Sequence, residues 1–390
     1  MNDTKAMDRR TFLKLGSVSA ASAVGAAAAV AGARLAKAED EAATTELQRG
    51  PVYRTLGRTG LEVSVVGVGA MRTTESAVLR AAFERGVNYV DTARCYAGGQ
   101  NERIVAQAFE GRRDKVYVAT KAHMVTPKEA IIQSVEESLK ALQTDYVDIV
   151  QLHKPNPGEV LHPDAKEALT QLKKDGKVRF TGVSTHSNQV EVIDKMVADE
   201  DKFYDMVLVA YNFTSGQDLK DAVARAAKAG LGVVAMKTQG GGYKIDELAD
   251  ISPHQAALKW VLEDPSVHTA VPAMVDLKQV MEDTEVMGMP MSRTEKQVLL
   301  RYKEAIKPFY CHMCGACDGT CPLGVDICTV NRCLMYAEGY GDIELAKTTY
   351  GELPDGKSAA ACGDCATCVA QCANGLDLAA KMRKAQALFA

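Results

Sequence analysis

Ten of the eleven cysteines lie near the end of the sequence, and eight of them form two runs with the same spacing. In each run the intervening stretches are two, two and three residues long, and Pro322 follows the first run directly. Thiolates are the soft ligands that iron–sulfur clusters require, and this spacing is typical of 4Fe–4S ligation. The candidate metal ligands are Cys311, Cys314, Cys317, Cys321, Cys362, Cys365, Cys368 and Cys372.

The repetition of one spacing argues against two other uses of cysteine. A disulfide framework suits an exported chain but does not explain why the spacing recurs. A zinc site needs only four ligands at different intervals. The sequence therefore predicts two 4Fe–4S clusters. The runs resemble those of two-cluster ferredoxins, in which the fourth cysteine of each run ligates the other cluster, so Cys321 would join Cys362, Cys365 and Cys368.

The segment between the runs differs from a compact β-rich ferredoxin. It contains a helical pattern over Asn331–Glu338 and a loop rich in Gly and Pro, which predicts a partly helical domain. Cys328 and Cys333 lie outside both runs and are interpreted as buried thiols, with ligation as the alternative. Cys95, far upstream, is interpreted as a packing residue.

A second group of polar residues stands at or just after the ends of apolar runs: Asp91, Tyr96, Lys121 and His153. Carbonyl reduction by hydride needs a proton donor, and a tyrosine with a pKa of about 10 holds its proton tightly near neutrality. We expect the Lys121 ammonium to lower the pKa of Tyr96, with Asp91 holding the lysine. His153 would donate to the carbonyl oxygen. The alternative is a domain that keeps these residues but only binds a nucleotide.

The elements that must position these side chains alternate along the middle of the chain. Short apolar runs are separated by amphipathic stretches such as Pro127–Leu142, a pattern that predicts a (β/α)8 barrel. The carboxyl ends of barrel strands form one mouth, which would bring the four residues together. An open doubly wound sheet is the alternative, although no Gly-x-Gly-x-x-Gly follows the first run. The predicted strands are Val65–Gly69, Val87–Val90, Val116–Thr120, Val147–Leu152, Val178–Val183, Met206–Ala210, Gly232–Met236 and Thr269–Val271.

These residues resemble the aldo-keto reductase family over about residues 53–285. The Asp–Tyr–Lys–His tetrad of that family is matched in order and spacing, and its opening hairpin is matched by Gly57–Gly60 with Val63 and Ser64. The resemblance implies a nicotinamide cofactor and a small carbonyl or alcohol substrate. The fusion of such a barrel to a cluster domain resembles a known bacterial variant.

The cofactor positions depart from the family pattern. Met236 stands where an aromatic residue stacks on the nicotinamide, and Leu208 replaces the glutamine that meets its carboxamide. Ala273, Met274 and Gln279 replace the clamp for the NADP 2′-phosphate, with only Lys278 nearby. The resemblance therefore allows NAD(P) but does not support a preference for NADP.

Other positions still fit a dinucleotide. Gly240–Gly242 follow the seventh run and could offer backbone N–H groups to a phosphate, the alternative being a flexible loop. The candidate cofactor contacts are Gly69, Met71, Ser184, Met236, Lys237, Gly240, Gly241 and Glu282.

The first residues are typical of an export signal. Arg9 and Arg10 precede a weakly apolar stretch rich in Ala, Gly and Ser, and Ala36–Ala38 offers a small-x-small cleavage site. The pattern predicts a twin-arginine signal peptide over residues 1–38, read by the twin-arginine export machinery, with a retained membrane anchor as the alternative. Residues 39–51 are expected to form a linker.

The 390 residues therefore divide into a barrel at 52–290 and an iron–sulfur domain at 291–390. A net charge of -4 gives no electrostatic reason to expect a nucleic-acid partner. We expect an exported, periplasmic oxidoreductase that interconverts a carbonyl and an alcohol, while its clusters pass electrons to or from a partner protein or carrier. The alternative is an iron–sulfur electron-transfer or binding module on a non-catalytic barrel.

Overall fold

The computed structural model describes residues 50–390 apart from 246–247, 249–250, 366 and 390. The predicted signal peptide lies outside the described residues, as does the predicted linker except for its last two residues. Within the described ranges, no helix combines the length and the apolar character needed to cross a membrane.

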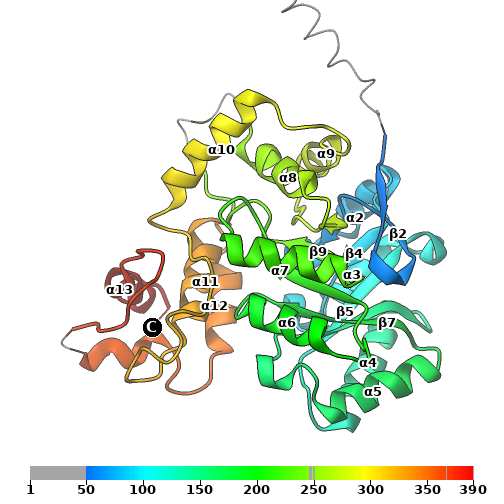
Figure 1. The fold of residues 1–390 in the computed structure, drawn as a ribbon, viewed down its shortest axis with the longest axis horizontal. Helices are drawn as coiled ribbons and strands as arrows, with labels where there is room; N and C mark the ends of the chain where they lie inside the picture. Colours follow the sequence, from blue (N-terminus) through cyan, green and yellow to red (C-terminus); the bar gives the residue numbers. More distant parts are fainter. Residues whose placement is uncertain (1–49, 246–247, 249–250, 366, 390) are drawn as a thin grey trace, which may run out of the picture. The chain divides into compact units, whose positions relative to one another are not determined.

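Eight parallel strands form one sheet in the order β10-β9-β8-β7-β6-β5-β4-β3 (Figure 1). Every predicted run overlaps one of them, which confirms the prediction of the strands, and β4, β5, β6 and β7 extend one or two residues beyond the predicted ends. The sheet curls until its ends meet: Gly67 N donates to Ala270 O at 2.8 Å, and Ala270 N donates to Val65 O at 2.9 Å. The predicted (β/α)8 barrel is thereby confirmed. The strands are β3 (Val68–Gly69), β4 (Tyr89–Asp91), β5 (Tyr117–Ala122), β6 (Val147–His153), β7 (Val178–Thr185), β8 (Met206–Ala210), β9 (Gly232–Met236) and β10 (Thr269–Ala270).

The strands are apolar because their side chains are buried on both faces, toward the barrel interior and toward the helices. A hairpin of β1 (Tyr53–Thr55) and β2 (Glu62–Ser64) fills the amino-terminal end of the barrel. Leu56 and Val63 from this hairpin pack in one buried cluster with Leu208 and Val234. The barrel interior is therefore filled with side chains at this end. The cavity described below lies at the opposite end.

Amphipathic helices cover the outside of the strands, as α4, α5, α6 and α7 do in Figure 1. In α4 the predicted apolar face is buried, with Ile131, Val135 and Leu142 almost inaccessible to solvent. The barrel helices are α2 (Ser76–Glu84), α3 (Asn101–Ala108), α4 (Lys128–Leu142), α5 (Pro163–Lys174), α6 (Gln189–Ala198), α7 (Gln217–Lys228), α8 (Pro253–Glu263) and α9 (Leu277–Glu285). Short 3-10 turns are η2 (Gly57–Thr59), η3 (Ala70–Arg72), η4 (Tyr96–Gly99), η5 (Arg113–Lys115) and η6 (Pro157–Glu159).

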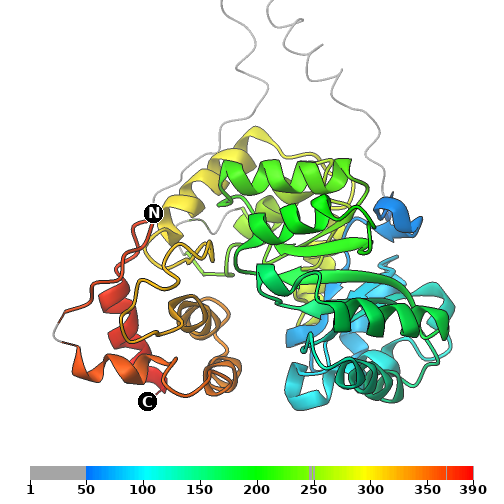
Figure 2. The ribbon, with the colours of Figure 1, turned by 60° about the horizontal axis from the view of Figure 1, so that its bottom comes forward.

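The remainder of the chain is helical, which confirms the prediction of a partly helical C-terminal region. Helix α11 packs against both α12 and α13, and these helices are coloured orange to red in Figure 2. Their shared core contains Val330, Leu334 and Met382 together with several cysteines. The elements are α10 (Arg293–Ile306), α11 (Ile327–Glu338), α12 (Ile343–Gly351), η8 (Ala359–Asp364) and α13 (Leu378–Phe389).

Helices α10 and α11 also pack against loops of the barrel. One buried cluster joins Phe213 and Tyr243 of the barrel to Tyr302 of α10 and Met335 of α11. Beside this cluster the backbones touch, since a Cβ added at Gly339 would lie 2.2 Å from the Gly241 carbonyl oxygen. The C-terminal end of α11 is therefore fixed against the loop that follows β9.

Candidate active site and cysteine clusters

Three buried side chains from adjacent strands form a hydrogen-bonded set at the barrel mouth. Lys121 at the end of β5 donates to the Asp91 carboxylate at the end of β4 and to the Thr92 carbonyl oxygen at 2.7 Å. Gln151 on β6 donates to the other Asp91 oxygen at 2.7 Å. The predicted proximity of Asp91 and Lys121 is present, and Gln151 is a further partner that the sequence did not single out.

Tyr96 and His153 lie over this set. The Lys121 Nζ is 4.8 Å from the centre of the Tyr96 ring, and the Tyr96 and His153 rings meet edge to face with centroids 6.2 Å apart. His153 is 8% exposed, whereas Tyr96 is partly exposed in the turn that opens η4. The structure thus brings all four predicted catalytic residues together.

The net shift in the pKa of Tyr96 is opposite to the predicted one. Burial raises the pKa of Tyr96 well above its ordinary value, the charges of Asp91 and Cys95 raise it further, and Arg332 opposes them. Lys121 already serves Asp91 and Thr92, and among the described residues no hydrogen bond joins its Nζ to the Tyr96 hydroxyl. Tyr96 is therefore held in its protonated form.

His153 has a partner that the sequence did not reveal. Its Nδ1 lies 3.0 Å from Nε2 of His123, and burial followed by the Lys121 charge lowers the pKa of His153 well below its ordinary range. Burial lowers the pKa of His123 to about 4, helped by Lys154 and Lys121. Both rings are therefore neutral at pH 7. Potential ligand atoms of Cys95, His123 and His153 lie within 4.8 Å of one another, so these side chains could also hold a metal ion.

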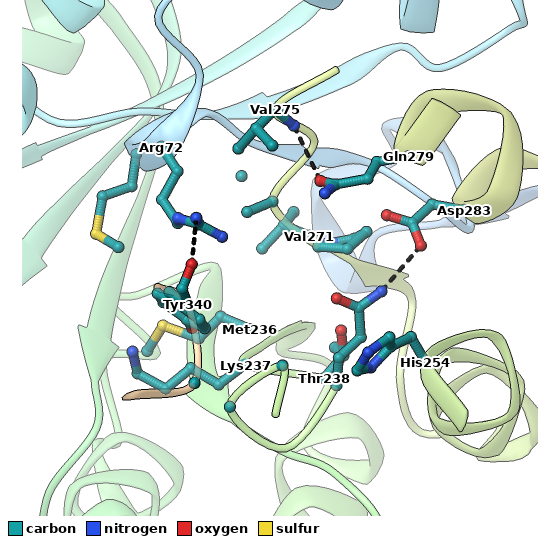
Figure 3. Close-up of a pocket in the computed structure, with 18 of the residues that line it drawn as sticks. Arg72, Met236, Lys237, Thr238, His254, Val271, Val275, Gln279, Asp283 and Tyr340 are labelled. Atoms are coloured by element: carbon teal, nitrogen blue, oxygen red, sulfur yellow. Dashed lines mark hydrogen bonds between the residues drawn. The ribbon is translucent and has the colours of Figure 1, made fainter. Parts of the chain in front are cut away.

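A cavity of about 400 Å³ opens beside this site and extends along the loops after β9 and β10 (Figure 3). It is lined by Tyr96 and Asp91 together with six of the eight predicted cofactor contacts: Gly69, Met71, Met236, Lys237, Gly241 and Glu282. Ser184 and Gly240 do not line it. Leu208 does not line it either, because its side chain packs in the barrel interior.

Two acidic residues stand at the far end of the cavity. Asp283 is 3% exposed and accepts a hydrogen bond from Gln239 at 2.9 Å, and burial followed by the Glu282 charge raises its pKa to about 8. Gln279 accepts from the Val275 backbone at 3.1 Å (Figure 3). Lys278, whose side chain is 82% exposed, pairs with Glu282. This end of the cavity holds no buried cation among the described residues.

The three glycines after β9 serve mainly to let other elements approach. A Cβ at Gly240 would meet Phe213 and Ile306 within 3.2 Å, and one at Gly241 would meet Tyr243 and Met335. The φ angles of Gly240–Gly242 are all positive, which glycine adopts without strain. Packing against α10 and α11 therefore accounts for these glycines, although Gly241 and Gly242 also line the cavity.

Helix α11 contributes side chains to the mouth that the sequence analysis missed. Arg332 donates to Nδ1 of His186 at 3.3 Å, and Lys237 donates to the Tyr336 hydroxyl at 3.4 Å. Arg72 donates to the carbonyl oxygen of Tyr340, and its guanidinium lies 4.6 Å from the centre of that ring (Figure 3). The spacing of residues 332, 336 and 340 by four is the one sequence signal that could have revealed this face.

The cysteines form two groups within the C-terminal core. The charges of Cys321, Cys365 and Cys368 all act on Cys362, adding to the burial that raises its pKa. Cys321 therefore lies near Cys362, and its assignment to the ligand set of the second run, which the resemblance to two-cluster ferredoxins implies, stays a prediction.

The other group gathers around the first run. Asn374 donates its side-chain amide to Cys314 Sγ at 3.5 Å and its backbone N–H to Cys372 Sγ at 3.3 Å, which brings the two runs together. Cys328 lies against Cys311, and its Sγ is 3.7 Å from that of Cys317. Cys328 is therefore within ligand range of the first run, which no spacing rule indicated. All eleven cysteines are free thiols.

Comparison with known proteins agrees with the barrel. Residues 67–244 match the sequence profile described as the Aldo/keto reductase family. Aldo-keto reductase YhdN of Bacillus subtilis is 35% identical over 157 residues, covering 35% of this chain and 47% of the relative. Methylglyoxal reductase DkgB of Salmonella typhimurium is 33% identical, covering 35% of this chain and 53% of the relative. The chain thus spans about half the length of the curated relatives it matches.

The likeness to solved structures extends over the whole barrel. An aldo-keto reductase of Klebsiella pneumoniae solved with NADPH is 27% identical, with a TM-score of 0.56, covering 64% of this chain and 95% of that one. The holo form of AKR11C1 from Bacillus halodurans is 25% identical, with a TM-score of 0.55, covering 64% of this chain and 96% of that one.

Proposed function

We propose that the protein reduces a small carbonyl compound to an alcohol at Tyr96, since residues 67–244 of the barrel match the profile of the Aldo/keto reductase family. One observation carries the proposal: Lys121 is hydrogen-bonded to Asp91, Tyr96 lies beside both Lys121 and His153, and Tyr96 and Asp91 line the adjacent cavity. A bound nicotinamide dinucleotide would supply the hydride.

The protonation states favour the direction of reduction. Tyr96 is protonated near neutrality and can donate to the oxygen of the carbonyl group, while its raised pKa makes it a weaker acid that needs help to release the proton. A neutral His153 can donate a hydrogen bond to the same oxygen without adding a charge. Lys121, held by Asp91, lies over the Tyr96 ring and would stabilise the phenolate that remains after proton transfer.

The shape and charge of the cavity suit a dinucleotide without a 2′-phosphate. Arg72 lines the cavity and offers a cation that a pyrophosphate would need, and Glu282 and Asp283 lie at the far end. Carboxyl groups accept hydrogen bonds from a ribose hydroxyl but repel a phosphate. We therefore infer that the cofactor is NAD(H), although the similar Klebsiella enzyme was solved with NADPH.

The eight cysteines of the two runs would hold two 4Fe–4S clusters. The contacts of Cys362 with Cys321 and of Asn374 with both Cys314 and Cys372 support one ligand set that combines Cys321 with the second run and one that combines Cys372 with the first. Helix α11 begins beside the first set and carries Arg332 at the barrel mouth. Cys328 and Arg332 are about 6 Å apart along the helix axis. The clusters would pass electrons between the barrel and a redox partner.

The proposal includes export. Arg9 and Arg10 before a weakly apolar stretch support secretion of the folded, cofactor-loaded protein through the twin-arginine machinery, with cleavage after Ala38. N-terminal sequencing of the extracytoplasmic protein tests this step, and a chain that still begins with Met1 would speak for a retained anchor.

Steady-state turnover of carbonyl compounds with NADH tests the reductase proposal. Tyr96→Phe removes only the phenolic proton and should lower turnover by about 10²–10⁴-fold while leaving cluster absorbance unchanged. Tyr53→Phe is the matched control, because Tyr53 lies in the amino-terminal hairpin and its hydroxyl contacts only the Gly86 carbonyl oxygen. Undiminished turnover in Tyr96→Phe would overturn the proposal.

A further inference from the structure

A buried arginine from the C-terminal region lies at the barrel mouth without a counter-ion. Arg332 is 6% exposed. Its Nη1 donates to Nδ1 of His186 at 3.3 Å and its Nη2 to the Thr329 hydroxyl at 3.3 Å, while its buried Nε has no partner. Both partners are neutral, since burial and then Arg332 lower the pKa of His186 well below its ordinary range. A buried guanidinium that meets only neutral groups is costly unless an anion joins it.

Two further cations share this region. Lys237 directly follows β9 and lines the cavity together with Tyr96 and His186. Its Nζ donates to the Tyr336 hydroxyl. Lys154 follows His153 directly. Within the described ranges, neither lysine nor Arg332 belongs to an ion pair. Three basic side chains, of which Lys154 is exposed, therefore gather near the proposed reaction site, and among the described residues acidic side chains act on them only from beyond ion-pair distance.

The pKa values of Lys237 and Lys154 are lowered by burial and also by repulsion between these positive charges. Burial and then Arg332 and Lys154 lower the pKa of Lys237 to about 7. Burial and then Arg332 lower the pKa of Lys154, opposed by Cys95, Glu352 and Asp326. Asp326 is occupied as the N-cap of α11, and Glu352 is exposed. An anion bound among the three cations would relieve their mutual repulsion.

We propose that Arg332, Lys237 and Lys154 form a subsite for the carboxylate of the substrate, so that the carbonyl compound reduced at Tyr96 is an oxo acid. This inference rests on the proposed reductase function. A planar guanidinium fits a planar carboxylate with two parallel hydrogen bonds. Arg332 donates to His186, which lines the same cavity as Tyr96 and Lys237, so an anionic group held there would lie close to the reacting carbonyl. A residue of α11, which follows the barrel in the chain, would thereby determine which substrates the barrel accepts.

Calorimetric titration of the full-length, cluster-loaded protein without cofactor tests the subsite, because no turnover can occur. Phenylglyoxylate is the carboxylate probe, its methyl ester is the neutral probe, and phenyl phosphate is the phosphate probe. We expect phenylglyoxylate to bind at least about 10-fold more tightly than the ester, as a charge-assisted hydrogen bond would give. Equal affinity for acid and ester in the wild-type protein would overturn the proposal, and tighter binding of phenyl phosphate would reassign the subsite to phosphate.

Substitution then locates the effect. Arg332→Gln should weaken phenylglyoxylate binding by about 10- to 100-fold and leave ester binding unchanged. Arg383→Gln, which removes an exposed charge on α13, is the matched control and should change neither. Loss of NADH binding in Arg332→Gln, with acid binding intact, would assign the arginine to the cofactor and overturn the subsite. Tight acid binding without any turnover would instead leave the subsite standing and overturn the reductase proposal.

Discussion

The polar groups at the barrel mouth and the thiols of the C-terminal core differ in the partners that the protein offers them. In the barrel, Asp91 is held by Lys121 and Gln151, so its charge is matched before any ligand arrives. In the C-terminal region the thiols meet mainly one another: contact with Cys328 and burial raise the pKa of Cys317. The first site is organised by side chains of the protein, whereas the thiols of the second would be brought into one compatible set by the proposed clusters.

Removal of a cluster should therefore have the largest effect on stability. The loss should be confined to the C-terminal region. We predict about eight iron atoms per chain, and loss of about four in Cys314→Ser or Cys365→Ser, because each residue belongs to a different ligand set. The C-terminal helices should lose protection against proteolysis while the barrel keeps its protection. Iron and sulfide analysis of anaerobic preparations measures this.

Cys333→Ala is the control for these variants, since Cys333 lies outside both ligand sets and should leave the iron content unchanged. Four iron atoms in the wild-type protein would reduce the claim to one cluster. Retention of all iron in Cys365→Ser would contradict the assignment of the second run.

A substitution at Asp91 should have the next largest effect, this time within the barrel. Asp91→Asn leaves the buried Lys121 ammonium without its counter-charge, which should lower the free energy of unfolding of the barrel by about 3–5 kcal/mol. Asp194→Asn breaks a pair with Arg225 in which both side chains are nearly half exposed, and should cost at most about 1 kcal/mol. Urea unfolding followed by tryptophan fluorescence of the single Trp260 compares the two, and equal losses would contradict the account.

The sequence located the barrel residues better than it located their partners. The strands could be predicted because buried parallel strands require apolar runs, and Asp91, Lys121 and His153 could be placed because such runs end at one mouth. Arg332 could not be placed there, since its position depends on how α11 packs against loops far away in the chain. The predicted direction of the Tyr96 pKa shift was wrong for the same reason. Burial is the largest cause of the shift, and burial depends on how the elements around the mouth assemble.

The cysteine region shows the same division between local pattern and tertiary contact. Regular intervals identified the two runs, and the resemblance to two-cluster ferredoxins implied that Cys321 lies near Cys362, on whose pKa its charge acts. Cys328 follows no interval and reaches the first run only because α11 begins beside it. Spacing therefore predicts candidate ligands that lie in one loop. It misses a thiol, such as that of Cys328, that a neighbouring helix brings close to them.

The last predicted effect on stability is a slope with pH and concerns the far end of the cavity. Asp283 keeps its proton in the folded state up to a pKa of about 8, above the value in the unfolded chain, so the folded state binds more protons between these two values. Stability should therefore fall as pH rises toward 8, by up to about 1.4 kcal/mol per pH unit. Asp283→Asn should remove this slope. Melting temperatures from pH 5 to pH 9 measure it, and parallel curves for the two proteins would contradict the assignment.

The most direct test of the central claim follows the transferred hydrogen. With NADH deuterated at both transferable positions of the nicotinamide ring, in ordinary water, phenylglyoxylate should yield an alcohol that carries one deuterium on its carbinol carbon. Electron delivery from the clusters would take that hydrogen from solvent instead, so an unlabelled alcohol from this experiment would contradict hydride transfer at Tyr96. It would leave the barrel as a support for the iron–sulfur centres.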